Sequence, residues 1–314
     1  MRPMQVAGAA VLLVLVLAYP ALVNAYWLTV GILAIFYAIV TASWTLLVGY
    51  AGQLSFGHVG FVSMGAYCSA LLVADFGLPI PLGMAAGLVL AGVAGAMVGY
   101  TCLRMHGPYL AIFTMAFSEV FRIIALTENE VTGGAGGLEV TPLFHTRSDA
   151  PYFYLGLALL AGSLGLMSWM TSSCWGLFFR AIRENEQAAA AAGVKVVRFR
   201  VLVFAIASSF AGLAGAFYAH FIGILTPDIG SIDQMGGVVA AAVIGGAESL
   251  PAAVVGAAFI EFLFEALRAY GEWRLVIFGA LLLLTVRFAR NGLFTLAWNS
   301  ALKLAPVRRP QPAE

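Results

Sequence analysis

The chain has 314 residues, of which 62% are apolar and only 10% are charged. Soluble domains carry about 25% charged residues, so this composition excludes a chain that is mainly surrounded by water. A net charge of +1 offers no basic surface for a nucleic-acid partner. The three cysteines lack metal-ligand spacing and lie in or beside apolar runs, so we expect neither a metal site nor a bound cofactor.

Hydropathy predicts ten membrane-spanning helices, each needing about 20 apolar residues. The first follows Arg2 and resembles a signal peptide, but no convincing cleavage site comes after it, so we expect a retained helix. The eighth is short and glycine-rich, which leaves a tilted or re-entrant course open. The predicted fold is an all-α polytopic membrane protein with helices near 7–23, 26–48, 56–74, 81–103, 109–126, 152–172, 200–222, 236–247, 251–268 and 273–290.

The basic residues predict the orientation of these helices. With the N-terminus in the cytoplasm, the inner segments hold twelve of the sixteen Lys and Arg residues, whereas acids gather in the outer loops. Both termini are then cytoplasmic. We expect one transmembrane domain over 1–305, with an outer loop at 127–151 and an inner loop at 173–199. A disordered cytoplasmic tail is predicted for 306–314.

The segment Gly49–Phe61 contains four glycines, which weaken a helix, yet it is too apolar for an ordinary solvent loop. Irregular backbone at membrane depth survives only when it is buried in protein or lines a wet cavity. We expect Ser55 to cap the next helix, whose N-terminus would offer amide donors to a carboxylate. A tight turn at the inner surface is an equally weighted alternative. His58 alone indicates neither a metal site nor a proton relay.

Two further segments carry charges or repeat this pattern. Gly246-Ala-Glu-Ser-Leu-Pro is a weak echo of the first segment, and it would mark two related halves. Glu119 and Arg122 lie three residues apart on the fifth predicted span, so their side chains can meet on one face. Charges in hydrocarbon are costly and usually face the bundle interior or water, and structural pairing or snorkelling of Arg122 is the favoured interpretation.

The inner loop predicts a short cytoplasmic helix from Arg180 to Lys195. Its alanines favour a helix, and Gly193 is placed as the C-terminal cap. A small-sided helix can dock closely into a groove on a partner. The alternative, a helix on the membrane surface, is disfavoured because the run lacks a bulky apolar face. The docking residues would be Arg180, Arg183, Glu184, Asn185, Glu186, Ala189 and Gly193.

No Walker A pattern occurs, so the chain does not bind ATP by that route. Uphill transport would therefore need energy from a partner or from an ion gradient. A self-contained secondary transporter would use Glu119 and either His58 or His220 to handle protons. A membrane-embedded enzyme would need convergent polar residues at one depth, and the sequence shows no nucleophile-and-base signature.

The chain resembles the LivM-type permease family of branched-chain amino acid ABC importers. The Arg-Ala-Ile-Arg-Glu-Asn-Glu run that begins at Arg180 is similar to the coupling-helix segment of this family. Where the family usually has Gly-Gly-Leu-Gly-Ser, the chain has Gly-Gly-Ala-Glu-Ser at residues 245–249. The resemblance rests on that run and on residues 49–58, 109–122, 132–138, 227–228 and 243–249, in family order.

The resemblance implies a permease subunit of the bacterial cytoplasmic (inner) membrane that is not itself an enzyme. It would carry leucine, isoleucine and valine; related permeases serve urea and short amides. The implied partners are a LivH-like sister permease, two cytoplasmic ATPase subunits and an extracytoplasmic substrate-binding protein. The Arg180–Gly193 segment would be the ATPase-coupling loop. The translocation path would include Gln53, Ser55, Gly57, His58, Glu248 and Ser249.

Overall fold

The computed structural model describes residues 14–105, 107–144, 146, 148–271, 273–288 and 292. Within these ranges the chain is almost entirely helical, and six helices are long and apolar enough to cross a membrane. The prediction of an all-α polytopic membrane protein is confirmed. The predicted tail at 306–314 and the start of the first predicted span lie outside the described residues.

Each predicted span corresponds to a helix. Residues 14–22 are helical. α2 continues directly into a π-helical turn, η1 (Leu46–Tyr50), and α4 into the 3-10 turn η2 (Cys102–Arg104). The long elements are α2 (Ala25–Thr45), α3 (His58–Phe76), α4 (Ile80–Thr101), α5 (Pro108–Thr127), α7 (Ala150–Ser172), α10 (Val196–Ile222), α11 (Ile232–Gly245), α12 (Leu250–Ala266) and α13 (Trp273–Phe288).

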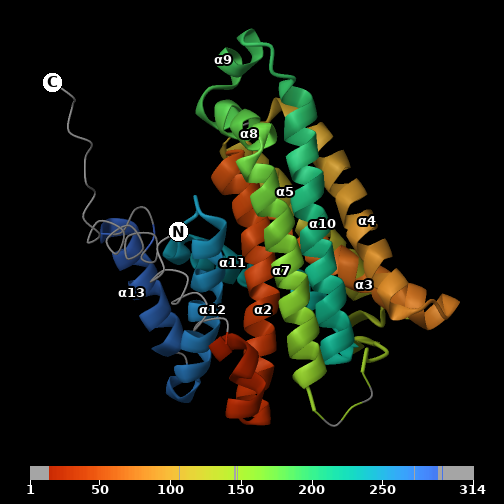
Figure 1. The fold of residues 1–314 in the computed structure, drawn as a ribbon. Coiled ribbons are helices and arrows are strands. Elements are labelled where there is room, and N and C mark those ends of the chain that lie inside the picture. Colours follow the sequence, from red (N-terminus) through yellow and green to blue (C-terminus); the bar gives the residue numbers. More distant parts are fainter. Residues whose placement is uncertain are drawn as a thin grey trace.

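Most of the short elements lie at the two ends of the bundle (Figure 1), and η4 (Pro227–Gly230) is the exception described below. We call the end that carries α8 (Cys174–Glu184) and α9 (Glu186–Ala191) the inner end, following the predicted orientation. The opposite, outer end carries a small antiparallel sheet in which β1 (Leu138–Glu139) pairs with β2 (Ile224–Leu225). The remaining short elements are α6 (Asn129–Thr132), η3 (Gly134–Gly136), η4 (Pro227–Gly230) and η5 (Arg268–Tyr270).

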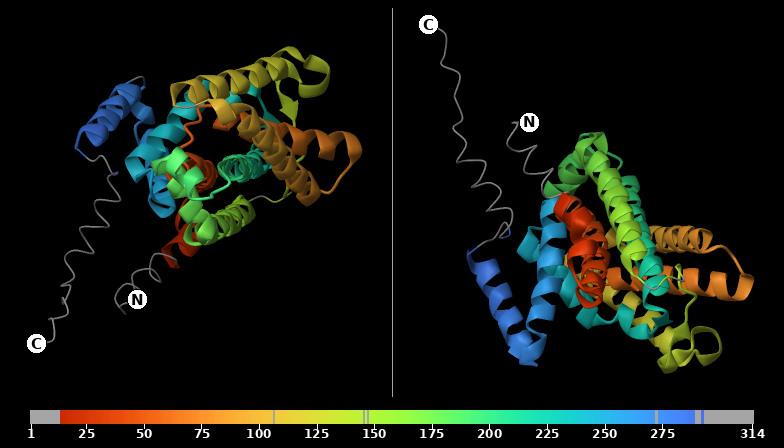
Figure 2. Two further views of the ribbon diagram at one scale, coloured as in Figure 1. Left: turned by 90° about the horizontal axis from the view of Figure 1, so that it is seen from above. Right: turned by 60° about the horizontal axis from the view of Figure 1, so that its bottom comes forward.

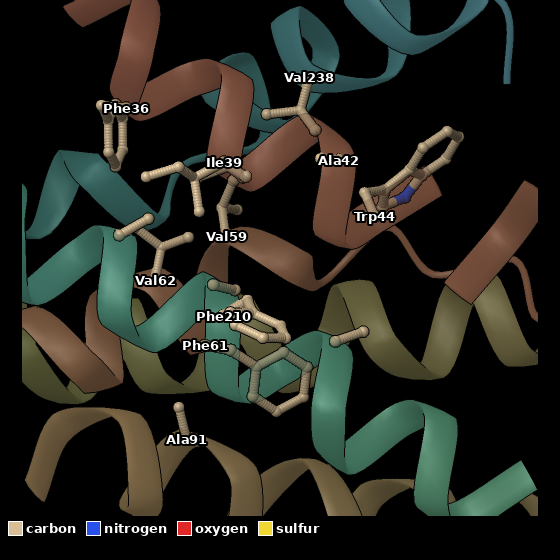
Figure 3. Packing of buried hydrophobic residues seen from close by; sticks show 14 of the residues in the cluster. Phe36, Ile39, Ala42, Trp44, Val59, Phe61, Val62, Ala91, Phe210 and Val238 are labelled. Atoms are coloured by element: carbon tan, nitrogen blue, oxygen red, sulfur yellow. The ribbon is translucent and has the colours of Figure 1, made fainter. Parts of the chain in front are cut away.

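α2 and α10 form the centre of the bundle, and the other long helices surround them (Figure 2, left). Phe36 and Ile39 of α2 meet Val62 of α3 in the core, with Phe210 of α10 nearby (Figure 3). Lipid gives no hydrophobic drive for helix association, so close backbone approach must supply the packing energy. Glycine permits such an approach between α3 and α10, because a Cβ on Gly65 would collide with the backbone of Gly212.

α11 is too short to cross a membrane. Its 14 residues span about 21 Å, against about 30 Å of hydrocarbon. The preceding turn, η4, lies deep in the bundle, because the Gly230 carbonyl accepts a hydrogen bond from Ser118 Oγ near the middle of α5 (3.3 Å). In the first turn of α11, Gln234 accepts a hydrogen bond from Tyr37, near the middle of α2. The chain therefore enters from the outer end as irregular backbone, becomes helical at depth and reaches the inner end after α11, where Glu248 pairs with Arg183. The helix alone does not cross, but the whole segment does, so it is not re-entrant.

Candidate functional site

The segment that follows η1 is a buried turn at the inner end, and the predicted cap by Ser55 is wrong. α3 begins only at His58, and its N-cap residue is Gly57. Gly57 lies against α5, where a Cβ would overlap the carbonyl oxygen of Thr114. The chain is non-helical at Ser55, whose carbonyl accepts a hydrogen bond from Trp44 Nε1 (2.7 Å). Its hydroxyl is fully buried, with no hydrogen-bond partner among the described residues.

The six residues assigned to the translocation path divide into two groups, and their assignment stays a prediction. Gln53, Ser55, Gly57 and His58 are buried within the chain. Glu248 and Ser249 lie in the more open turn between α11 and α12.

Hydrogen bonds hold two of the buried residues in place. Gln53 Nε2 donates to the carbonyl of Arg200 (3.3 Å), and His58 Nε2 lies 2.8 Å from Ser43 Oγ. His220, the other histidine considered for proton handling, likewise contacts a hydroxyl: its Nε2 lies 2.8 Å from Ser69 Oγ. Both imidazoles are therefore enclosed in the packed bundle.

The predicted inner helix is two helices instead of one. Asn185 is extended (φ −158°, ψ 107°) and separates α8 from α9. Its side chain explains the break, because Oδ1 accepts a hydrogen bond from Ala188 N (2.9 Å) and so caps α9. The predicted C-terminal cap is confirmed: Gly193 has φ +87°, and Val194 N donates to the Ala189 carbonyl (3.0 Å).

A single buried arginine ties α9 to the bundle. Arg200, the fifth residue of α10, is only 5% exposed. Its Nη1 lies 3.2 Å from both carboxylate oxygens of Glu186, at the start of α9. The same guanidinium donates to the carbonyls of Leu103 (3.1 Å) and Met105 (3.2 Å), after α4. Three chain segments therefore meet at one side chain.

Sequence reasoning missed this role and counted Arg200 only as an inner positive charge. The available signal was its spacing. Arg200 lies four and seven residues before Phe204 and Ala207, which are fully buried on α10. An arginine in register with a buried helical face is placed to enter the core rather than the solvent.

A second arginine ties α8 to two other segments. Arg183 donates to the carbonyl of Gly49 and pairs with the carboxylate of Glu248. Gly49 leaves no room there, because a Cβ would collide with the Ala247 carbonyl. The two segments that echo each other in sequence are thus neighbours. Arg180 lies over the ring of Tyr50, 5.3 Å from its centroid, which adds a cation–π contact.

A polar cavity of about 230 Å³ lies between these segments. Its lining combines the buried turn, the end of α8 and the start of α9, and includes Gly52, Gln53, Glu184, Asn185, Glu186 and Arg200. The loop that carries α8 and α9 is therefore fixed to the bundle at its base. Its outer surface stays open: Ala188, Ala190 and Ala191 are exposed, whereas Ala189 is buried against the chain.

The other charged site lies on α5. Glu119 and Arg122 form the ion pair that their spacing predicted, with Nη2 to Oε1 at 2.6 Å and Nε to Oε2 at 3.0 Å. Asp228, in η4, is 3.9 Å from Arg122 Nη1. The pair lies at the edge of the packed bundle, half-buried, with the Arg122 and Glu119 side chains 23% and 30% exposed. Sequence reasoning had not connected Asp228 with them.

These features define an integral membrane protein with several spans and an inner loop that is anchored to the bundle. Its sequence contains no Walker A motif for binding ATP. Residues 26–286 match the family model described as the permease component of branched-chain amino acid transport systems, and the chain belongs to this family. It is thus a multi-pass inner-membrane transport component and not an enzyme.

Three relatives show the range of the similarity. The chain is 29% identical to the high-affinity branched-chain amino acid permease protein LivM of Escherichia coli and 30% identical to LivM of Salmonella typhimurium. Each alignment covers 96% of this chain and 75% of the relative. The LivH permease of Escherichia coli is 24% identical, over 82% of this chain and 90% of the relative. No solved structure matches the chain significantly.

Proposed function

We propose that this chain pairs with a LivH-like sister permease to move branched-chain amino acids, and that two cytoplasmic ATPases drive it. A binding protein would deliver the amino acid at the outer end. Relatives named LivM and LivH both match, which supports a pair of homologous permeases. The observation that best supports this proposal is the loop of α8 and α9. This loop protrudes from the bundle (Figure 1) and is anchored through Arg183 and Arg200.

The chemistry of the loop fits a docking handle. Its exposed alanines allow close approach of another protein surface. Its base is tied by charge-assisted hydrogen bonds, which are stronger than neutral ones. A displacement of α9 would reach the end of α4 through Arg200, because Glu186 and the Leu103 carbonyl share that guanidinium. A displacement of α8 would reach η1 and the α11–α12 turn through Arg183.

The buried turn and the α11–α12 turn would then form the moving inner mouth of the translocation path. This is the role that we propose for Gln53, Ser55, Gly57, His58, Glu248 and Ser249. Two of them contact the anchors of the loop directly: Gln53 bonds to the Arg200 carbonyl, and Glu248 pairs with Arg183. Uptake assays with leucine, isoleucine, valine and urea, offered separately, would separate the proposed solutes from urea.

Co-purification with the ATPases tests the handle directly. Ala190→Trp enlarges an exposed side chain of α9 and should release the ATPases while the permease pair stays assembled. Val131→Trp is the matched control, because Val131 is 50% exposed at the opposite end. ATPases that remain bound to the Ala190→Trp complex as they do to the control would remove α9 from the docking surface.

A further inference from the structure

Charges on an open face of α5 require an explanation that packing within this chain does not supply. Glu119 shares a helix face with Ile112, Ala116 and Ile123, which recur at spacings of four, three and four residues. All three neighbours are exposed. α4 also has an open face, with Val89, Val93 and Met97 exposed, but its sequence contains no charged residue. The face of α4 suits lipid, whereas an ion pair facing hydrocarbon would be costly.

The deep turn η4 points to water on the same face. Irregular backbone at membrane depth is tolerated where it is buried in protein or lines a wet cavity. The Gly230 carbonyl places the end of η4 near the middle of α5, and Asp228, two residues earlier, lies beside Arg122 with its side chain 82% exposed. An exposed carboxylate at this depth needs an aqueous or polar neighbour. The α5 and η4 surface therefore borders a polar compartment within the membrane.

The arrangement of the three charges matches an α-amino acid head group. We propose that Glu119, Arg122 and Asp228 hold the charged head group of the amino acid during its passage through the membrane, an inference that rests on the proposed function. Glu119 occupies Nε and Nη2 of Arg122. Within the described ranges, Nη1 makes no hydrogen bond and faces Asp228 across 3.9 Å.

Each part of the solute has a complementary group here. The α-carboxylate accepts hydrogen bonds from Arg122 Nη1. The α-ammonium donates to Asp228 and Glu119, which give the cluster one net negative charge. The branched side chain lies against Ala116 and Ile123, the exposed apolar residues next to Glu119 on this face. The cluster thus replaces the hydration that both head-group charges lose.

The test uses the reconstituted complex, which contains the sister permease, the ATPases and a leucine-loaded binding protein. Asp228→Asn should lower ATP-dependent leucine uptake by about tenfold or more, the effect of losing one charge-assisted hydrogen bond. Asp228→Glu keeps the charge and should retain most uptake. Arg122→Gln should behave like Asp228→Asn, with assembly unchanged. The control is Arg268→Gln, which breaks another i,i+3 pair, that of Arg268 with Glu265 at 3.2 Å.

The reactivity of an introduced cysteine gives a second measurement, which a purely structural role of the ion pair would not predict. In a chain that keeps uptake after alanine replaces Cys68, Cys102 and Cys174, Ile123→Cys should react with a charged, membrane-impermeant thiol reagent. Val93→Cys on α4 should stay inert.

Two results would overturn the inference: wild-type uptake by Asp228→Asn, or an Ile123→Cys thiol as inert as the control. If the Arg122→Gln complex fails to assemble, the leucine uptake of the Asp228→Asn complex decides, because Asp228 is exposed and its replacement should not disturb packing. A wild-type permease pair that takes up leucine in the absence of the ATPases would instead refute the proposed function.

Discussion

Arg200 at the inner end and Arg122 on α5 are each paired with a glutamate, but the rest of each guanidinium differs. Arg200 is 5% exposed, and its other donors reach the carbonyls of Leu103 and Met105. Arg122 is 23% exposed, and its Nη1 faces a carboxylate beyond hydrogen-bond distance. A buried guanidinium bonded to several backbone carbonyls holds segments together, whereas one with donors to spare can receive a ligand. The inner site is therefore built as a joint and the α5 site as a receptor.

Removing the inner guanidinium should have the largest effect. Arg200→Met leaves the Leu103 and Met105 carbonyls without this donor, at a cost of about 1–3 kcal/mol each. It also frees α9 from α4. We expect a lower melting temperature of the detergent-purified complex and uptake near background. A melting temperature equal to that of wild type would show that Arg200 is not a joint.

Lysine substitutions sharpen the comparison. Lysine keeps the charge but lacks the planar fork of donors. Arg200→Lys should lose most coupling, because one ammonium cannot reach carbonyls and a carboxylate on three segments. Arg122→Lys should keep more uptake than Arg200→Lys, since one charge near Glu119 and Asp228 is retained. Initial uptake rates of the two variants, measured side by side, decide this, and the reverse order would break the distinction.

Close packing at the inner end gives a smaller, local prediction. A Cβ on Gly49 meets the Ala247 carbonyl, so Gly49→Ala should push apart the two turns that Arg183 joins. The expected cost is about 1–3 kcal/mol from overpacking. Gly162→Ala on α7 is the control, because nothing lies within 4 Å of its added Cβ. Equal thermal stability of the two variants would mean that the turns separate freely.

The smallest effect is expected at the outer surface. Arg268 is 64% exposed and pairs with Glu265. Exposed pairs contribute about 0–1 kcal/mol, so Arg268→Gln should change neither the melting temperature nor uptake measurably. A large loss of uptake there would show that any outer charge affects transport, and the special status of the α5 site would fail.

Local patterns in the sequence were sufficient for the helices and for the contacts within one helix. Apolar run length gave the positions of the helices, though not which of them cross the membrane, and three-residue spacing gave the Glu119 and Arg122 pair. The left-handed Gly193 cap followed from a glycine after an alanine run. Each of these depends on neighbours a few residues away, which the sequence displays directly.

Contacts between distant segments were not accessible in this way. The burial of Arg200 depends on carbonyls about a hundred positions earlier in the chain, and Asp228 reaches Arg122 only because η4 descends into the bundle. Ser55 fails as a cap because α3 starts only at His58, and the glycine before it, Gly57, packs against α5. The break at Asn185 had a local signal, its preference for N-cap positions, which the surrounding alanines outweighed in our prediction.

The number of leucine molecules imported per ATP hydrolysed, measured in proteoliposomes for wild type and Glu186→Gln, tests the joint most directly. Glu186→Gln weakens the link from α9 to Arg200 without removing a residue of the bundle. The predicted result is continued ATP hydrolysis with a clearly lower import ratio. An unchanged ratio at full hydrolysis would contradict the claim that the inner arginine transmits the motion of the loop.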